Sequence, residues 1–182
     1  MNKESIQQWK LIVFDVDGTL AANNETELLP GVAAWREAHP DQAITLCSNQ
    51  GGVGLRLWME EGGFGDPQQY PTEASINARL RHIANLMDTD YYVCFAYQSK
   101  KSGKWSPTPI GGEALIEWNP RYRKPAPGML LRAMMDFGAD PSDTLMVGDG
   151  DEDQQAAQAA GCRFTRADEF FGRVTTGEDW RP

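Results

Sequence analysis

The sequence contains few of the residues from which disulfide frameworks and zinc sites are built. Only three of its 182 residues are cysteines, at the widely separated positions Cys47, Cys94 and Cys162, and only two are histidines, His39 and His82. An odd number of scattered cysteines with no Cys-x-x-Cys pair predicts reduced and mostly buried thiols. A tetrahedral zinc site is disfavoured, because such a site needs clustered cysteine or histidine ligands.

Long apolar runs are also missing. No window approaches the length that a membrane-spanning helix requires, and the polar start MNKESIQQWK lacks the apolar core of a signal peptide. A cytoplasmic location without a membrane partner is therefore expected. The apolar fraction of 41% and the charged fraction of 24% are typical of an ordinary globular protein. The length predicts one domain over residues 1–182.

Charge is unevenly distributed along the chain. The net charge is −9, but residues 97–124 contain six cationic and two anionic side chains and carry +4, so the remainder carries −13. A basic segment on an acidic body indicates either a local anion site or a solvated loop that carries lysines. The acidic total disfavours extended contacts with nucleic-acid phosphates, although the basic segment leaves nucleic acid open as a partner.

Apolar runs of strand length alternate with amphipathic segments. The predicted strands are 10–15, 43–48, 91–97, 143–149 and 162–165, and the predicted helices are 30–39, 52–64, 71–88, 127–138 and 152–161. This alternation predicts an α/β, Rossmann-like three-layer sandwich with a mainly parallel central sheet and helices on both faces. Residues 97–123, rich in glycine and proline, are predicted to form a basic irregular loop.

The segment 71–88 has the clearest helical pattern. Thr72 suits the N-cap position. The apolar residues expected on one face of this helix are Ile76, Leu80, Ile83, Leu86 and Met87. Stripes of this kind predict core packing rather than a cofactor site.

Polar side chains follow three of the predicted strands where each strand ends. They are Asp15, Asp17 and Thr19 after the first strand, Ser48 and Asn49 after the second, and Asp149 and Asp153 after 143–149. Each group alone would fit a surface turn or the start of a helix. Because the carboxyl ends of parallel strands meet at one rim, the groups together favour a magnesium and phosphate site, with Lys124 as a nearby cation.

These segments resemble the haloacid dehalogenase (HAD) superfamily of aspartate-dependent phosphatases. The matching segments are DVDGTL, TLCSNQGG, RKPAPGM and VGDGDED, in the order of that family. The sequences SNQ and RKPAPGM within these segments are most similar to those of the small-capped branch, which includes histidinol-phosphate, heptose-bisphosphate and polynucleotide 3′-phosphatases. The resemblance implies a Mg²⁺-dependent phosphomonoester hydrolase that acts through an aspartyl-phosphate on a small, sugar- or nucleotide-like substrate.

The resemblance also implies roles for the aspartates. Asp15 is expected to be the nucleophile and a ligand of Mg²⁺, together with the backbone carbonyl of Asp17 and the side chain of Asp149. The side chain of Asp17 is expected to act as general acid and base.

The remaining site residues are expected to bind phosphate or to support the site. Ser48, the backbone around Asn49 and Lys124 would hold the phosphoryl oxygens. Thr19 would stabilise its loop by hydrogen bonding. Asp153 would hold the geometry of the site or reach the metal through water.

The spacing of the matching segments leaves no room for a large cap domain. Only 33 positions separate Asp15 from Ser48, and the 76 positions from Ser48 to Lys124 are filled by predicted helices, a strand and the basic loop. An open site is implied, with residues 97–124 as the element that selects the substrate. The zinc-binding Cys/His loop of some histidinol and heptose relatives is absent, which weakens those two substrate assignments.

Aromatic residues lie among the cations of the basic loop. Trp105, Trp118 and Tyr122 could stack on bases or sugars, but packing onto the body of the protein is the favoured interpretation.

Other functions stay open as alternatives. A nucleic-acid 3′-end phosphatase would use the basic loop. A phosphoaspartate receiver domain also combines aspartyl-phosphate, Mg²⁺, a hydroxyl group and a lysine, but its acidic pair and phosphorylated aspartate lie on different strands. The complete set of motifs disfavours an inactive scaffold. The residues specify no oligomeric state.

Overall fold

The computed structural model describes residues 9–112 and 115–173, so the polar N-terminal start and Glu113 of the basic segment lie outside the described residues. The strands form one sheet in the order β3-β2-β1-β4-β5, and every neighbouring pair is parallel. They are β1 (Leu11–Phe14), β2 (Ile44–Asn49), β3 (Tyr91–Cys94), β4 (Thr144–Gly148) and β5 (Arg163–Arg166). The helices are α1 (Val32–Ala38), α2 (Gly51–Gly62), α3 (Glu73–Leu86), α4 (Gly128–Phe137), α5 (Asp151–Ala160) and α6 (Ala167–Phe170). The predicted Rossmann-like α/β fold is confirmed.

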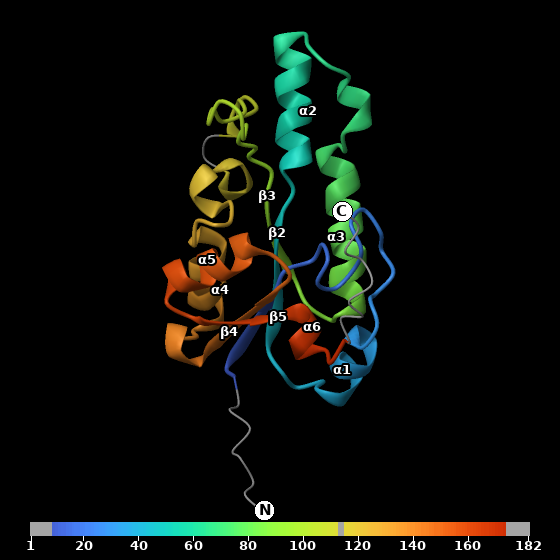
Figure 1. The fold of residues 1–182 in the computed structure, drawn as a ribbon, viewed down its shortest axis with the longest axis vertical. Helices are drawn as coiled ribbons and strands as arrows, with labels where there is room; N and C mark the ends of the chain where they lie inside the picture. Colours follow the sequence, from blue (N-terminus) through green and yellow to red (C-terminus); the bar gives the residue numbers. More distant parts are fainter. Residues whose placement is uncertain (1–8, 113–114, 174–182) are drawn as a thin grey trace, which may run out of the picture.

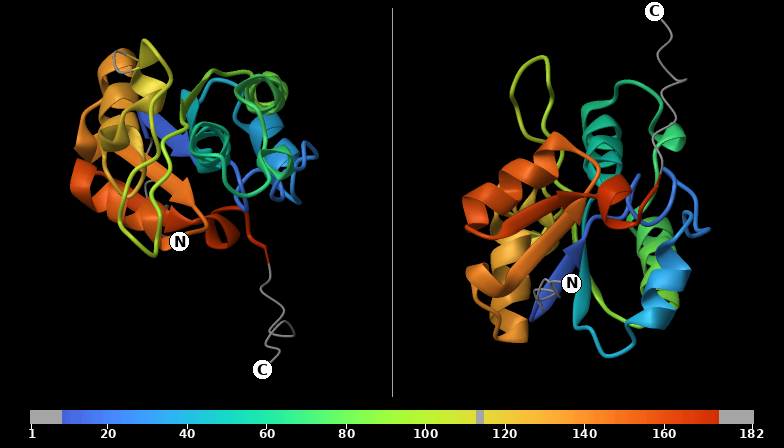
Figure 2. Two further views of the ribbon diagram at one scale, coloured as in Figure 1. Left: turned by 90° about the horizontal axis from the view of Figure 1, so that it is seen from above. Right: turned by 60° about the horizontal axis from the view of Figure 1, so that its bottom comes forward.

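Helices cover both faces of the sheet (Figures 1 and 2). α4 and α5 pack on one face, and α1, α3 and α6 pack on the other. Successive side chains of a strand point to opposite faces, so Ile12 and Phe14 of β1 pack toward α1 and α3, whereas Leu11 and Val13 pack toward α4 and α5. All four are buried, which explains why β1 is apolar throughout.

The connections between strands reverse direction beside β1. The chain moves outward from β1 through β2 to β3, and it then returns to β4 on the other side of β1. In open parallel sheets, ligands bind outside the carboxyl ends of the strands at such a reversal. Asp15 directly follows β1 and Asp149 directly follows β4, so the fold itself brings these two carboxylates together.

Two predicted helix ends are confirmed. The hydroxyl oxygen of Thr72 accepts a hydrogen bond from the Ser75 N–H at 3.1 Å and caps α3. α4 ends at Gly138, whose φ of 60° lies in the left-handed region.

The predicted apolar face of α3 is correct except at Leu86. The buried members are Ile76, Leu80, Ile83 and Met87. Leu86 is 47% exposed, and Ala84 on the other flank of the stripe is fully buried instead. The face that packs on the sheet is therefore rotated toward Ala84, which the apolar pattern alone did not reveal.

Two further elements differ from the prediction. The strand predicted over 91–97 ends at Cys94, because the Phe95 N–H bonds the carbonyl of Glu117 at 2.6 Å. The four-residue helix α6 was not predicted. The segment 167–171 covers the face of the sheet toward α1, where Phe170 and Phe171 pack against the core.

The basic segment 97–123 is irregular in its described part and contains two short 3₁₀ turns, Ile116–Trp118 and Pro120–Tyr122. Trp118 is buried and its ring lies 5.5 Å from that of Phe95, so packing is confirmed for this aromatic residue. Trp105 is 38% exposed. Among the described residues, no helix has the length and apolar character needed to cross a membrane.

Two adjacent leucines of α4 provide a test of this packing. Leu130 is fully buried and Leu131 is 47% exposed. We expect Leu130→Ala to lower the free energy of unfolding by about 2–5 kcal/mol, because it leaves a cavity against the sheet. Leu131→Ala, the matched control, should change it by less than about 0.5 kcal/mol. Urea unfolding measures both, and similar losses would contradict the assigned face of α4.

Candidate active site

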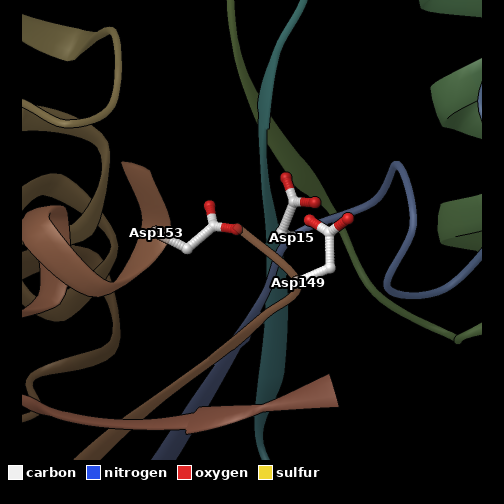
Figure 3. A group of neighbouring side chains, drawn as sticks. All are labelled: Asp15, Asp149 and Asp153. Carbon is white, nitrogen blue, oxygen red and sulfur yellow. The ribbon is translucent and has the colours of Figure 1, made fainter. Parts of the chain in front are cut away.

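Three carboxylates converge at the rim of the sheet (Figure 3). Asp15 follows β1, Asp149 follows β4, and Asp153 lies in the first turn of α5. One carboxylate oxygen from each lies within 4.8 Å of the others. Asp15 and Asp153 are buried, whereas Asp149 is exposed. Like charges this close destabilise the fold unless cations offset them.

Lys124 supplies one such cation. Its side chain is 1% exposed, and its Nζ lies 2.6 Å from Asp15 Oδ1 and 2.6 Å from Asp153 Oδ1. It also donates to the carbonyl of Cys47 at 2.8 Å, so each of its three N–H groups has an acceptor. Burial alone would lower the pKa of Lys124, but the charges of Asp15 and Asp153 outweigh it and raise that pKa. The ammonium group therefore stays charged in the interior.

The group as a whole still lacks positive charge. One ammonium group faces three carboxylates. Burial raises the pKa of Asp15 to about 7, with Asp153 adding to this effect and Lys124 opposing it. The pKa of Asp149 is also raised, mainly by burial and next by the negative charge of Asp153. A divalent cation would offset the two remaining negative charges, and clustered carboxylate oxygens are donors that Mg²⁺ prefers. The residues present thus fit the metal.

Two glycines allow the carboxylates to approach this closely. Gly18 has a φ of 79°, and a Cβ built there would lie 2.1 Å from Asp149 Oδ2. A Cβ on Gly148 would lie 2.4 Å from Asp153 Oδ2. A side chain at either position would displace the neighbouring carboxylate. Gly18 is therefore favoured both by the nearby Asp149 and by the left-handed φ of its own turn.

Asn49 fixes the backbone of Lys124. Its side-chain Nδ2 donates to the Lys124 carbonyl at 2.8 Å, and its Oδ1 accepts from the Lys124 N–H at 3.0 Å. The phosphate-binding role predicted for Asn49 concerned the backbone around it, and these two bonds of its side chain were not predicted. Nearby, the Ser48 hydroxyl is buried and accepts a hydrogen bond from Gln50 Nε2 at 2.8 Å.

The carboxylate of Asp17 does not belong to the acidic group. Its Oδ1 forms an ion pair with Arg79 at 2.7 Å, and its Oδ2 accepts from Gln50 Nε2 at 2.6 Å. Neither partner was predicted from the sequence. Gln50 lies in the second motif, where no role was predicted for it, and Arg79 lies on α3 outside the predicted apolar face.

Thr19, predicted to stabilise its loop by hydrogen bonding, forms its hydrogen bonds through the backbone. Its side chain is fully buried, yet its hydroxyl oxygen has no hydrogen-bond partner among the described residues. Its backbone N–H donates to the Val16 carbonyl at 3.3 Å, and its carbonyl accepts from Arg173 Nη2 at 2.7 Å.

Comparison with known proteins agrees with this arrangement. The family model described as HAD-hydrolase-like matches residues 121–165, the segment that carries Lys124, Asp149 and Asp153. Phosphoglycolate phosphatase 1 of Pseudomonas aeruginosa is 30% identical over 139 residues, which is 76% of this chain and 43% of that protein. The matching family model and this relative support the resemblance of the chain to the haloacid dehalogenase superfamily.

Two further comparisons show how far the likeness extends. D-glycero-α-D-manno-heptose-1,7-bisphosphate 7-phosphatase of Burkholderia mallei is 51% identical over 58 residues, or 31% of each chain. The matches thus span less than half the length of these two curated relatives. D,D-heptose 1,7-bisphosphate phosphatase from B. bronchiseptica, solved with magnesium and phosphate, superposes with a TM-score of 0.55 at 22% identity. That superposition covers 85% of this chain and 78% of the other, and it supports the fold.

The close approach of Gly18 to Asp149 leads to a testable prediction. We expect Gly18→Ala to push the Asp149 carboxylate out of the acidic group and to weaken Mg²⁺ binding by about 10- to 100-fold, as changes beside metal ligands do. The measurement is a calorimetric Mg²⁺ titration.

Gly138→Ala is the matched control. Gly138 also has a positive φ, but a Cβ there would have nothing within 4 Å. Its substitution should leave Mg²⁺ affinity unchanged. Equal affinity of the Gly18→Ala and wild-type proteins would show that the contact with Asp149 does not position that carboxylate.

Proposed function

We propose that this protein is a Mg²⁺-dependent phosphomonoester hydrolase that acts through an aspartyl-phosphate. The observation that carries the proposal is the buried ammonium group of Lys124 between Asp15 and Asp153, at the rim where Asp149 also lies. A phosphate dianion repels an attacking carboxylate, so catalysis of its transfer consists largely of positioning and charge compensation. This site offers a carboxylate that is held in place and a cation beside it.

In the first step, an oxygen of Asp15 attacks the phosphorus of the bound ester. The new Asp15–phosphorus bond forms as the bond from phosphorus to the ester oxygen breaks. Asp17 gives its proton to that oxygen, so the product leaves as a neutral alcohol. Ser48 holds a phosphoryl oxygen through its hydroxyl group, and the positive charge of Lys124 beside Asp15 offsets the charge of the phosphoryl oxygens during the transfer.

In the second step, a water molecule attacks the phosphorus of the aspartyl-phosphate. Asp17, now ionised, takes a proton from this water, and the bond to Asp15 breaks. Inorganic phosphate leaves, and both aspartates return to their starting forms. The same carboxyl group therefore serves as acid and then as base.

Mg²⁺ bound by Asp15, Asp149 and the backbone carbonyl of Asp17 would supply positive charge that offsets the carboxylates and the phosphoryl oxygens. Asp153 would act by holding Lys124 and the turn that starts α5. Its second oxygen accepts from the Gly150 N–H at 3.1 Å, in agreement with such a supporting role.

The proposed substrate is a small phosphorylated metabolite. Both curated relatives are named for phosphatases of such compounds, phosphoglycolate in one case and a heptose bisphosphate in the other. The described part of the basic loop contains Lys100, Lys101 and Lys104, all of which are exposed, and this loop is the proposed element of selectivity. A single domain and a cytoplasmic location remain predictions from the sequence.

A screen of phosphate release over a panel of phosphorylated metabolites tests the proposed function directly. Asp15→Asn should abolish release of phosphate from any compound in the panel, and also from a generic aryl phosphate, while the protein stays folded. Chelation of Mg²⁺ should abolish the activity of the wild-type protein, and added Mg²⁺ should restore it. Asp88→Asn is a matched control, because the Asp88 side chain is 96% exposed. Activity retained by Asp15→Asn would remove Asp15 from the role of nucleophile.

The role of Asp17 has a separate test. We expect Asp17→Asn to slow turnover by about 10²- to 10⁴-fold, the usual contribution of a general acid and base. With an activated aryl phosphate the first step needs no acid, so the aspartyl-phosphate should accumulate and be visible by intact-protein mass spectrometry. An unchanged turnover rate would contradict the acid–base assignment.

A further inference from the structure

Arg79 is a buried charged residue that the proposed mechanism does not use. It lies on α3, and its side chain is 9% exposed. Its Nε donates to the carbonyl of Glu25 at 2.7 Å, and its Nη2 donates to the carbonyl of Ala22 at 3.1 Å. The guanidinium is therefore fixed against the loop that follows the first motif, which runs beside α3 (Figure 1). A buried charge is costly unless it has partners, so its placement calls for a physical reason.

The partner of Arg79 is the proposed acid–base residue. Its Nη2 reaches Asp17 Oδ1 at 2.7 Å. The other oxygen, Oδ2, accepts from Gln50 Nε2, and the same nitrogen of Gln50 donates to the Ser48 hydroxyl. Ser48 belongs to the proposed phosphate site. The two oxygens of Asp17 thus face different surroundings, one toward α3 and the other toward the phosphate site.

We propose that Arg79 is a positioning residue for Asp17. By anchoring Oδ1, it directs Oδ2 toward the ester oxygen of the bound substrate, so that Oδ2 gives and takes the proton. Gln50, a neutral donor, yields this oxygen to the substrate, whereas the charged contact with Arg79 is kept. The planar guanidinium suits this task, because it bonds two backbone carbonyls and a carboxylate at the same time. The inference rests on the proposed function and deepens it.

The test compares two substrates that differ in their need for an acid. Phenyl phosphate requires a proton on its departing oxygen, whereas 2,4-dinitrophenyl phosphate releases a stable anion. The quantity measured is kcat/KM, which reports the steps up to release of the alcohol. For Arg79→Met we expect a loss of about 10- to 100-fold with phenyl phosphate, part of the contribution of a general acid. With 2,4-dinitrophenyl phosphate the loss should stay below about 3-fold.

Arg81→Met is the matched control. Arg81 lies on the same helix, and its ion pair with Asp90 at 3.0 Å is between side chains that are 57% and 85% exposed. This variant should behave as the wild type with both substrates. Circular dichroism and the melting temperature check that each variant is folded.

Two further variants keep the inference falsifiable. Arg79→Lys retains the positive charge but not the planar arrangement of several N–H donors. Its loss of kcat/KM should therefore be smaller, and it should again be larger with phenyl phosphate than with 2,4-dinitrophenyl phosphate. This variant decides the matter if Arg79→Met does not fold. In the Asp17→Asn background, Arg79→Met should reduce kcat/KM for phenyl phosphate by less than about 3-fold further, because the group that it positions is already gone.

Failure of the inference differs from failure of the proposed function. Equal losses with the two substrates, no loss, or a full additional loss in the Asp17→Asn background would overturn the positioning role while the wild-type protein remains a phosphatase. A wild-type protein that hydrolyses neither substrate in the presence of Mg²⁺ would overturn the proposed function, and this inference with it.

Discussion

Three carboxylates, those of Asp15, Asp149 and Asp153, meet at the rim of the sheet and repel one another. The buried ammonium group of Lys124 holds two of them, Asp15 and Asp153, close together. Its three N–H groups bond Asp15, Asp153 and the carbonyl of Cys47, which come from three separate parts of the chain. Removing one member of such a buried set leaves the others uncompensated, at a typical cost of about 3–5 kcal/mol. The ends of β1 and β2 and the start of α5 are therefore tied to one another through a single nitrogen atom.

The rest of the local structure serves to keep that nitrogen in place. The side chain of Asn49 bonds both the N–H and the carbonyl of Lys124, so β2 fixes the backbone from which the lysine extends. Gly18 and Gly148 leave room for the carboxylates of Asp149 and Asp153. Because the sheet reverses its connections beside β1, all of these groups lie at the rim where α/β sheets bind ligands. The fold, the glycines and the ion pairs thus depend on one another.

The sequence was sufficient to predict the fold class, the approximate strands and most helices, because each has a strong period or a clear end signal. It was also sufficient to predict the rim that carries Asp15, Asp149 and Lys124, since these residues follow or precede strongly patterned elements. The errors fall where only tertiary contacts decide. The exposure of Leu86 depends on how α3 is rotated against the sheet, and α6 is too short to show a period.

The partners of Asp17 could not have been found from the pattern, for a related reason. An arginine in an amphipathic helix is usually solvated, and nothing in the local sequence distinguishes Arg79 from Arg81 on the same helix. What separates them is the loop after β1, whose carbonyls at Ala22 and Glu25 receive one guanidinium and not the other. Arg79 thus meets Asp17, which is distant in the chain, because of the conformation of the loop after β1, and no single residue type in the sequence indicates that conformation.

The two aspartates of the first motif are held from opposite sides of the sheet. Asp15 pairs with Lys124, which precedes α4, whereas Asp17 pairs with Arg79 on α3. Their side chains also differ in exposure, 10% for Asp15 and 27% for Asp17. A nucleophile benefits from a fixed cation and little solvent, while a proton carrier must meet the departing alcohol and the incoming water. Because Gly18 turns the chain directly after Asp17, two carboxylates one residue apart reach environments that suit these different tasks.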